Sequence, residues 1–394
     1  MSFKKCFFVC LALVLVGGVL TGCGDNGGNS GSSETSQKPL PPLDKERVAA
    51  DEARGIKFSD DKRTLVKYNE SLPDKEYTIP SGVTAIGRKA FEGCTGLTSV
   101  TIPSSVTTIG DLAFRECSNL TGVTLMEGVT AIGHSAFARC ENLTSMTFPS
   151  SVTKIGDGVF KGCSNLTSVT IPSGVTKIGH SAFVLCSNLT SVTIPSSVTT
   201  IGEEAFYKCS NLTSVTIPEG VTTIGGETFR GCKSLTGVTI PNSVTTIGER
   251  AFEGCEKVEV SPGSRNFYTD ASGALIDSKN KKLLYFPPDF SGAYTIPAGV
   301  TIIGRGAFKG CRSLTSVTMP EGVTTIGLEA FSGCRNLRSV TIPAGVKTID
   351  YEAFAWCSNL TNVTIPASVK TIEARAFSGC PCEASVKKQF PKYR

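Results

Sequence analysis

Residues 189–211 read LTSVTIPSSVTTIGEEAFYKCSN, and most of the chain consists of copies of this stretch. The copies recur with a period of 23 residues, and each carries one phenylalanine of a column. A fixed period in the twenties is typical of a solenoid, in which each repeat stacks on the last. The sequence therefore predicts one α+β repeat solenoid of twelve repeats, with short strands and short helices. The column is Phe91, Phe114, Phe137, Phe160, Phe183, Phe206, Phe229, Phe252, Phe308, Phe331, Phe354 and Phe377.

The first half of a repeat has the pattern of a half-buried strand. Leu97, Val100 and Ile102 follow an L-x-x-L-x-L spacing, and Ser99 and Thr101 alternate with them. Because successive strand side chains point to opposite faces, we expect the apolar residues to face inward and the two hydroxyls outward.

The second half of a repeat contains a turn and a short apolar stretch. Residues 106–109 form a second extended segment, and Gly110 then turns the chain. We expect residues 111–116 to form a helical stub that buries Ala113 and Phe114. Since Asp350 and Glu373 replace the glycine in the last two repeats, a positive φ is not obligatory there.

The N-terminus has the features of an export signal. Lys4 and Lys5 precede an apolar run of 14 residues at positions 7–20, which is too short for a membrane span of ~20 residues. Leu20-Thr21-Gly22-Cys23 then resembles the bacterial lipobox, and this resemblance implies cleavage before Cys23 and its lipidation. The alternative is an ordinary signal peptide with a cysteine near its end. Two acyl chains would anchor the protein stably to a membrane.

The remaining segments divide the chain as follows. The hairpin pattern at 57–80 is echoed at 275–297, and both copies enter a repeat through Tyr-Thr-Ile-Pro. We expect the first copy to cap the open end of the solenoid and the second to be an inserted hairpin, because exposed strand edges need a cover. The predicted organisation is a signal peptide (1–22), a flexible tether (23–43), an N-terminal cap of a short helix and a hairpin (44–78), repeats 1–8 (79–255), a hairpin insertion (256–295), repeats 9–12 (296–380) and a C-terminal tail (381–394).

The repeat pattern Ile-Gly-x-x-Ala-Phe-x-x-Cys-x-x-Leu-x-x-Val-x-Ile-Pro closely resembles the BspA-like class of bacterial leucine-rich repeat proteins. The resemblance covers roughly residues 79–255 and 296–380. It implies a surface-exposed protein that adheres to host matrix or serum proteins, host cells or other bacteria. It also implies that host innate receptors could sense the lipidated N-terminus.

Twelve of the 16 cysteines form a second column, one in each repeat. Neighbouring repeats ~4.8 Å apart would be within disulfide reach, but nothing in the sequence pairs alternate repeats. We therefore favour small buried side chains at this position. Single ligands spaced by 23 residues do not resemble a zinc site. Cys380 and Cys382, separated by one proline, could instead pair locally or be redox-active.

Catalytic chemistry has little support in the sequence. His134 and His180 are the only histidines and stand two repeats apart, with Asp157 between them. This column could be a weak metal site, but two solvated residues are the simpler interpretation. Neither histidine belongs to a nucleophile motif, and no phosphate-binding glycine loop is present. We therefore predict no enzyme, no cofactor and no metal.

The outward strand positions are the broadest candidate for partner binding. They form a Ser/Thr ladder on the expected concave face, which suits a protein or a glycan. The alternative is that threonine merely suits an exposed strand and keeps it soluble, and regular threonine arrays also allow ice binding. The candidates are Ser99, Thr101, Ser168, Thr170, Ser191, Thr193, Ser214, Thr216, Ser316, Thr318, Ser339 and Thr341.

Breaks in the repeat pattern are candidates for specificity. Trp356 is the only tryptophan, and its position suggests exposure. The insertion offers Phe267, Tyr268, Tyr285 and Phe286 beside a lysine cluster. The alternative for these rings is that they pack the hairpin onto the neighbouring repeats.

The charge balance excludes one class of partner. The net charge is +5, and removal of residues 1–22 leaves 37 basic against 34 acidic residues, or +3. This excess is too small and too scattered for nucleic-acid binding. We expect an exported, lipid-anchored and surface-exposed protein, held at the membrane by its N-terminal lipid, that binds extracellular or host proteins or glycans as an adhesin. The alternative is a periplasmic or envelope scaffold for partners of the same cell.

Overall fold

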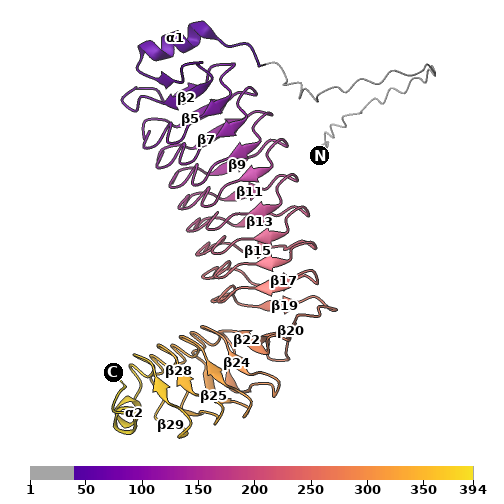
Figure 1. Cartoon of the computed structure of the whole chain (residues 1–394), viewed down its shortest axis with the longest axis vertical. Coiled ribbons are helices and arrows are strands. Elements are labelled where there is room, and N and C mark those ends of the chain that lie inside the picture. Colours follow the sequence, from indigo (N-terminus) through magenta and orange to yellow (C-terminus); the bar gives the residue numbers. More distant parts are fainter. Residues whose placement is uncertain (1–39, 394) are drawn as a thin grey trace, which may run out of the picture. The chain divides into compact units, whose positions relative to one another are not determined.

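A computed structural model describes residues 40–393. The predicted signal peptide, most of the tether and the lipidation site at Cys23 lie outside these residues. The described chain forms a solenoid whose repeats follow one another in sequence order (Figure 1). Each repeat contributes one strand to each of two parallel strand sets.

The first strand set carries the Ser-Val-Thr pattern of the repeats. Its members pair in parallel and in register within sheets of two to four strands, so that Val169, for example, lies between Met146 and Val192. The set consists of β3 (Glu76–Thr78), β5 (Ser99–Ile102), β7 (Gly122–Leu125), β9 (Ser145–Thr147), β11 (Ser168–Thr170), β13 (Ser191–Thr193), β15 (Ser214–Val215), β17 (Val238–Ile240), β19 (Val258–Val260), β23 (Gly292–Thr295), β25 (Leu314–Thr318), β27 (Ser339–Thr341) and β29 (Asn362–Thr364).

The second strand set carries the Thr-Ile pairs that precede the glycine column. It pairs in the same parallel register, as in Ile201 beside Ile224. The set consists of β2 (Thr64–Lys67), β4 (Ala85–Ile86), β6 (Thr108–Ile109), β8 (Ala131–Ile132), β10 (Lys154–Ile155), β12 (Lys177–Ile178), β14 (Thr200–Ile201), β16 (Thr223–Ile224), β18 (Thr246–Ile247), β22 (Lys282–Tyr285), β24 (Ile302–Ile303), β26 (Thr325–Ile326), β28 (Thr348–Ile349) and β30 (Thr371–Ile372).

The helical stub expected at residues 111–116 is wrong, because this segment consists of successive turns. Leu112 and Glu116 have φ values of 58° and 61°, which a right-handed helix excludes. The backbone N–H groups instead bond to the next repeat, as in Phe114 N to the carbonyl of Ala136 at 2.7 Å. The stack therefore has a third line of inter-repeat hydrogen bonds, which satisfies groups that a helix would have bonded internally.

The glycine column is explained by close approach between repeats. A Cβ atom at Gly133 would lie 2.5 Å from the backbone nitrogen of Asp111, and one at Gly225 would lie 2.4 Å from that of Glu203. Neither glycine has a positive φ. The preference for glycine therefore comes from the spacing of neighbouring repeats.

The repeats form two blocks, one over residues 79–255 and one over residues 296–380. The phenylalanine column forms a continuous stack within each block. The rings of Phe114 and Phe137 lie 5.2 Å apart at an interplanar angle of 4°, and those of Phe331 and Phe354 lie 5.0 Å apart at 2°. At the start of each block the stack begins on the ring of a hairpin residue. Tyr68 lies 5.1 Å from Phe91, and Phe286 lies 4.7 Å from Phe308.

Both ends of the described chain are covered by a short helix. Helix α1 (Lys45–Ala53) begins at Asp44, whose side chain accepts a hydrogen bond from Arg47 N. It is followed by β1 (Lys57–Phe58), which pairs antiparallel with β2. At the other end lies α2 (Glu383–Gln389), within the range assigned to the tail. Tyr393 follows it, and its hydroxyl accepts a hydrogen bond from Phe377 N at 2.8 Å.

The insertion separates two hydrophobic cores, one in each block of repeats. Its strands β20 (Phe267–Thr269) and β21 (Leu275–Asp277) pair antiparallel, and β21 also pairs with β22. Leu275 packs into the core of the first block, whereas the adjacent Ile276 packs into the core of the second. The hairpin thus closes one stack and starts the next. β19 and β23 lie within the range assigned to the insertion, yet they pair with repeat strands β17 and β25.

Candidate binding surfaces

The predicted Ser/Thr ladder lies on one exposed face of the first strand set. Ser168, Ser191 and Ser214 are adjacent across β11, β13 and β15, and Thr170 pairs with Thr193. These side chains are exposed, as are Ser339 and Thr341 in the second block, whereas Ser99, Thr101 and Ser316 are half-buried. The ladder therefore presents its hydroxyls most openly on β9 to β15.

The ladder hydroxyls differ from those of neighbouring threonines. Thr190 donates through its hydroxyl to the carbonyl of Thr167 at 3.1 Å, and Thr213 donates in the same way to Thr190. These threonines tie successive repeats together. Within residues 40–393, by contrast, no hydrogen bond involves the side chains of Ser191 or Thr193. Their hydroxyls therefore remain able to bond to a partner.

Trp356 is exposed, with 62% of its surface accessible. Its φ is 61°, in the left-handed region. The ring lies against Gly379 of the next repeat, where a Cβ atom would come within 2.7 Å of Trp356 Cε3. The position is therefore available to a partner on one face of the ring.

The insertion aromatics do not act as a group. Phe267, Tyr285 and Phe286 are buried, so the partner-binding role predicted for them is corrected to a packing role. The hydroxyl of Tyr285 donates to the carbonyls of Cys255 and Glu256 at 3.1 Å each, which closes the end of the first block. Only Tyr268 is exposed, with 41% of its surface accessible. The other three rings are buried because the hairpin packs against repeats on both of its sides.

The cysteine column consists of buried, free thiols among the described residues. Except for Cys94 and Cys311, which begin the two blocks of repeats, each column thiol donates to the carbonyl of the phenylalanine 26 residues earlier, as in Cys140 Sγ to Phe114 O at 3.1 Å. Burial raises the pKa of Cys94 to about 11 and that of Cys163 to about 12. Because the thiolate is the reactive form, these thiols are unreactive while buried.

Cys380 and Cys382 are also buried and free. Hydrogen bonding with Cys357 is the largest influence on Cys380 and, with burial, raises its pKa to about 12. Hydrogen bonding with Cys380, followed by burial, likewise raises the pKa of Cys382. This arrangement does not favour the thiolate that redox chemistry requires.

The histidine column is exposed, and hydrogen bonds connect its residues along the stack. His134 Nδ1 accepts a hydrogen bond from Asp157 N at 3.1 Å, and Asp157 Oδ1 accepts one from His180 N at 2.8 Å. Within residues 40–393 no group of three His, Cys, Asp or Glu side chains is placed to hold a metal ion. The column therefore links the starts of successive turns.

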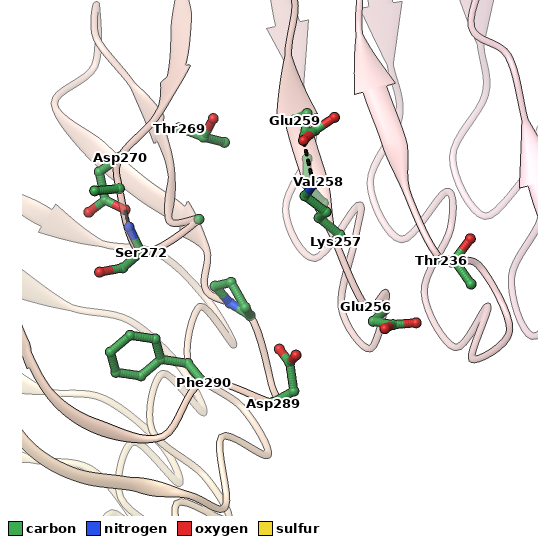
Figure 2. Close-up of a pocket in the computed structure, with 13 residues that line it drawn as sticks. Thr236, Glu256, Lys257, Val258, Glu259, Thr269, Asp270, Ser272, Asp289 and Phe290 are labelled. Carbon is green, nitrogen blue, oxygen red and sulfur yellow. Dashed lines mark hydrogen bonds and ion pairs between the residues drawn. The ribbon is translucent and has the colours of Figure 1, made fainter.

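A cleft of about 450 Å³ lies where the insertion interrupts the repeats. Lys257 and Glu259 of the β19 region line one side, and Asp270 lines the other (Figure 2). Asp289 and Phe290 lie at its lower edge in that view. The aromatic residues of the insertion, Phe290 among them, were candidates from the sequence, whereas Lys257, Glu259, Asp270 and Asp289 were not. Asp289, an acidic side chain within the insertion, was the available signal.

The described residues contain two helices, α1 and α2. Neither α1 nor α2 has the length and apolar character that a bilayer-spanning helix needs. The predicted lipidation at Cys23 concerns a residue outside those the structure describes.

The comparisons with known proteins agree with this architecture. The family model for the BspA type leucine rich repeat region matches in six copies over residues 68–183, 130–259 and 291–389. A leucine rich cell surface protein from Faecalibacterium prausnitzii is 30% identical over 88% of this chain and 94% of its own, with a TM-score of 0.62. The leucine rich repeat protein of T. pallidum is 34% identical, covering 46% of this chain and 86% of its own (TM-score 0.43). One from Bacteroides ovatus is 26% identical, covering 82% and 90% (TM-score 0.46). A search of curated proteins gives no match.

Proposed function

Because the chain belongs to the BspA-type leucine-rich repeat family, we propose that it is an exported, lipid-anchored scaffold on the bacterial surface that binds proteins or glycans. Its partners would be host matrix or serum proteins, host cells or other bacteria, so that it acts as an adhesin. The similar Faecalibacterium prausnitzii protein is described as a cell surface protein, which supports this location. Cys23 would carry the lipid, and residues up to about position 43 would tether the solenoid.

The observation that carries the proposal is the in-register Ser/Thr ladder. Ser145, Ser168, Ser191 and Ser214 stand in one line across four paired strands. A rigid array of free hydroxyls can donate and accept hydrogen bonds at a fixed spacing, which suits polar and glycosylated surfaces. This binding needs no catalytic group.

The experiment that tests the proposal is a binding screen of the full chain against immobilised matrix proteins, serum proteins and glycans. Saturable binding to at least one of them is expected. The alternative is a scaffold inside the envelope that binds partners of the same cell. Protease treatment of intact cells separates the two, because complete protection of the repeats would contradict surface display.

A further inference from the structure

The hydrogen bonds that join neighbouring repeats stop at the junction between the two blocks. No sheet contains strands from both sides of residues 264–266, because β18 and β19 end their sheets and β20 and β23 begin others. In the turns, Phe229 N donates to the carbonyl of Ala251 at 2.7 Å, but the equivalent Phe252 N bonds to no carbonyl of the second block. Within residues 40–393, no backbone–backbone hydrogen bond joins the two sides. Side chains therefore hold the junction closed.

On the strand side, the junction is held by the apolar packing of the insertion. Phe267, Leu275 and Tyr285 are buried in the core of the first block. The hydroxyl of Tyr285 also donates to the carbonyl of Cys255 at 3.1 Å. Because apolar packing does not depend on the charge of a side chain, this side stays closed when the pH changes.

On the turn side, the junction is held by ion pairs. Arg250 is buried, with 4% of its side chain accessible, and its Nη2 donates to Glu329 Oε2 across the junction at 2.6 Å. Its Nε also donates to Glu253 of its own turn. These side chains fill the space beside Gly306, where a Cβ atom would lie 3.2 Å from Glu253 Oε2 and 3.3 Å from Arg250 Nε. The ion pairs therefore occupy the place where the backbone hydrogen bonds of the turns are missing.

The charges on this side are nearly balanced near neutral pH. Seven charged side chains make up the cluster, namely Arg230, Arg250, Arg305, Lys309, Glu227, Glu253 and Glu329. Four positive and three negative charges leave +1, and protonation of the three carboxylates would leave +4. Beside the cluster, Lys282 pairs with Glu249 across the junction at 2.7 Å.

Arg305 gives the cluster a positive charge that no ion pair neutralises within residues 40–393. Its Nε is buried without a hydrogen-bond partner. Burial alone would raise the pKa of Glu329, but the hydrogen bond from Lys309 and the nearby guanidinium groups lower it. Glu329 therefore stays ionised to a lower pH than an exposed glutamate. Once the carboxylates are protonated, Arg250 faces Arg305 and Lys309 across the junction, and like charges repel.

We propose that the junction is an acid-sensitive joint, in which Arg250 and Glu329 hold the turn side closed and their separation lets the second block tilt about the insertion. The joint is closed while the carboxylates are ionised, and it opens as the pH falls through their titration. Both blocks stay folded, because their own hydrogen bonds do not cross the junction. The first strand set passes here from β19 to β23, in separate sheets, so opening changes the orientation of its two parts. The joint does not depend on the proposed binding function.

Pulsed electron paramagnetic resonance on the purified full chain measures the opening. Spin labels are attached at Glu203→Cys and Ala374→Cys, two exposed turn positions in different blocks. The native thiols of the described residues are buried and should not react, which the unmodified chain controls. One narrow distance is expected at pH 7. At pH ~3, below the usual carboxylate pKa values, the distribution should broaden and lengthen by about 5 Å, roughly one strand spacing.

A matched pair of variants tests the bridge itself. Glu329→Gln removes the carboxylate that spans the junction, and should give the longer distance already at pH 7. Glu227→Gln removes the same charge from within the first block, where it pairs with Arg230 at 2.7 Å, and should leave the distance unchanged. Equal distances in the two variants would contradict the proposal, as would an unchanged distance in the unmodified chain at pH ~3.

Amide hydrogen exchange under the same conditions distinguishes a joint from unfolding. Strands β13 and β27 lie within the first and second blocks, and their protection against exchange should be retained when the distance lengthens. Loss of protection in both strands together with the change in distance would mean that the repeats unfold, and would overturn the proposal.

Discussion

The hydroxyl of Tyr294 donates a hydrogen bond to Asp270 Oδ2 at 2.7 Å. This pair repeats an arrangement at the N-terminal cap, where the hydroxyl of Tyr77 donates to Asp51 Oδ2 at 2.6 Å. Both tyrosines begin a block of repeats in the first strand set, and both acids lie in the covering segment. Burial, reinforced by the acid, raises the pKa of both tyrosines. The insertion therefore covers and anchors the start of the second block, as the N-terminal cap does for the first.

This relationship predicts the effect of removing one hydroxyl. Tyr294→Phe should destabilise the second block by about 1.5–3 kcal/mol, because it removes a hydrogen bond to a charged acceptor. Urea unfolding followed by hydrogen exchange across β23 and β25 would measure the loss. Tyr268→Phe is the control, since that exposed hydroxyl makes no hydrogen bond within the described residues. Equal effects of the two variants would contradict the anchoring role.

The two-sided insertion predicts that adjacent residues stabilise different blocks. Leu275→Ala and Ile276→Ala each remove a buried side chain and should cost about 2–5 kcal/mol. Leu275→Ala should accelerate amide exchange mainly in β17 and β19, and Ile276→Ala mainly in β23 and β25. Exchange mass spectrometry resolves the two regions. The same change in amide exchange from both variants would show that the insertion does not separate two cores.

The ion pairs of Glu329 predict an acid-sensitive contribution to stability. Burial alone would raise its pKa, but the hydrogen bond from Lys309 and the charge of Arg250 lower it below the usual 4.5. A lowered pKa in the folded state stabilises the protein above pH ~4.5, and this contribution is lost as the pH falls through the folded pKa.

The test compares unfolding between pH 3 and 7, roughly the range over which a carboxylate titrates. Glu329→Gln should lower stability near neutral pH by about 1.5–3 kcal/mol and should flatten the loss of stability on acidification. Glu321→Gln, an exposed residue of the same repeat, should leave the pH profile unchanged. A steep acid transition retained in Glu329→Gln would show that other carboxylates cause it.

The cysteine column predicts a thiol count. With Cys23 acylated, the mature chain keeps the thirteen cysteines that the structure describes as free. A colorimetric thiol titration should give almost no reaction in the native state, because burial raises the thiol pKa values. After denaturation without reductant it should give thirteen thiols. A count near zero would mean that neighbouring cysteines of the column are joined by disulfides.

Much of this structure could be predicted because the repeat is a local pattern. The alternation of Ser191 and Thr193 with Val192 predicted which side chains are exposed, and the period predicted that they form a ladder. The turns at residues 111–116 could not be predicted, because Leu112 and Glu116 carry no residue signal for a positive φ. The reason for Gly133 depends on the distance to the preceding repeat, which a single repeat does not contain.

The insertion was the hardest segment to predict for a similar reason. Phe267 and Tyr285 are aromatic at a break in the pattern, as a binding site would be, but they pack against both neighbouring blocks. The cleft depends on β20 lying beside β19 without pairing to it, which becomes visible only when the strand pairing is known. The structure of the insertion therefore depends on contacts between the two blocks, which the repeat pattern does not contain.

Partner binding through the Ser/Thr ladder can be tested directly by one measurement. Bacteria displaying the full chain would be assayed for adhesion to the partner found in the binding screen, with the triple variant Thr170→Lys, Thr193→Lys and Thr216→Lys. Bulky charges at three adjacent rungs should reduce adhesion about tenfold or more. The control places lysine at Thr246, Thr325 and Thr348, exposed positions of the second strand set, and should adhere like the unmodified chain. Undiminished adhesion of the ladder variant would contradict partner binding through the Ser/Thr ladder.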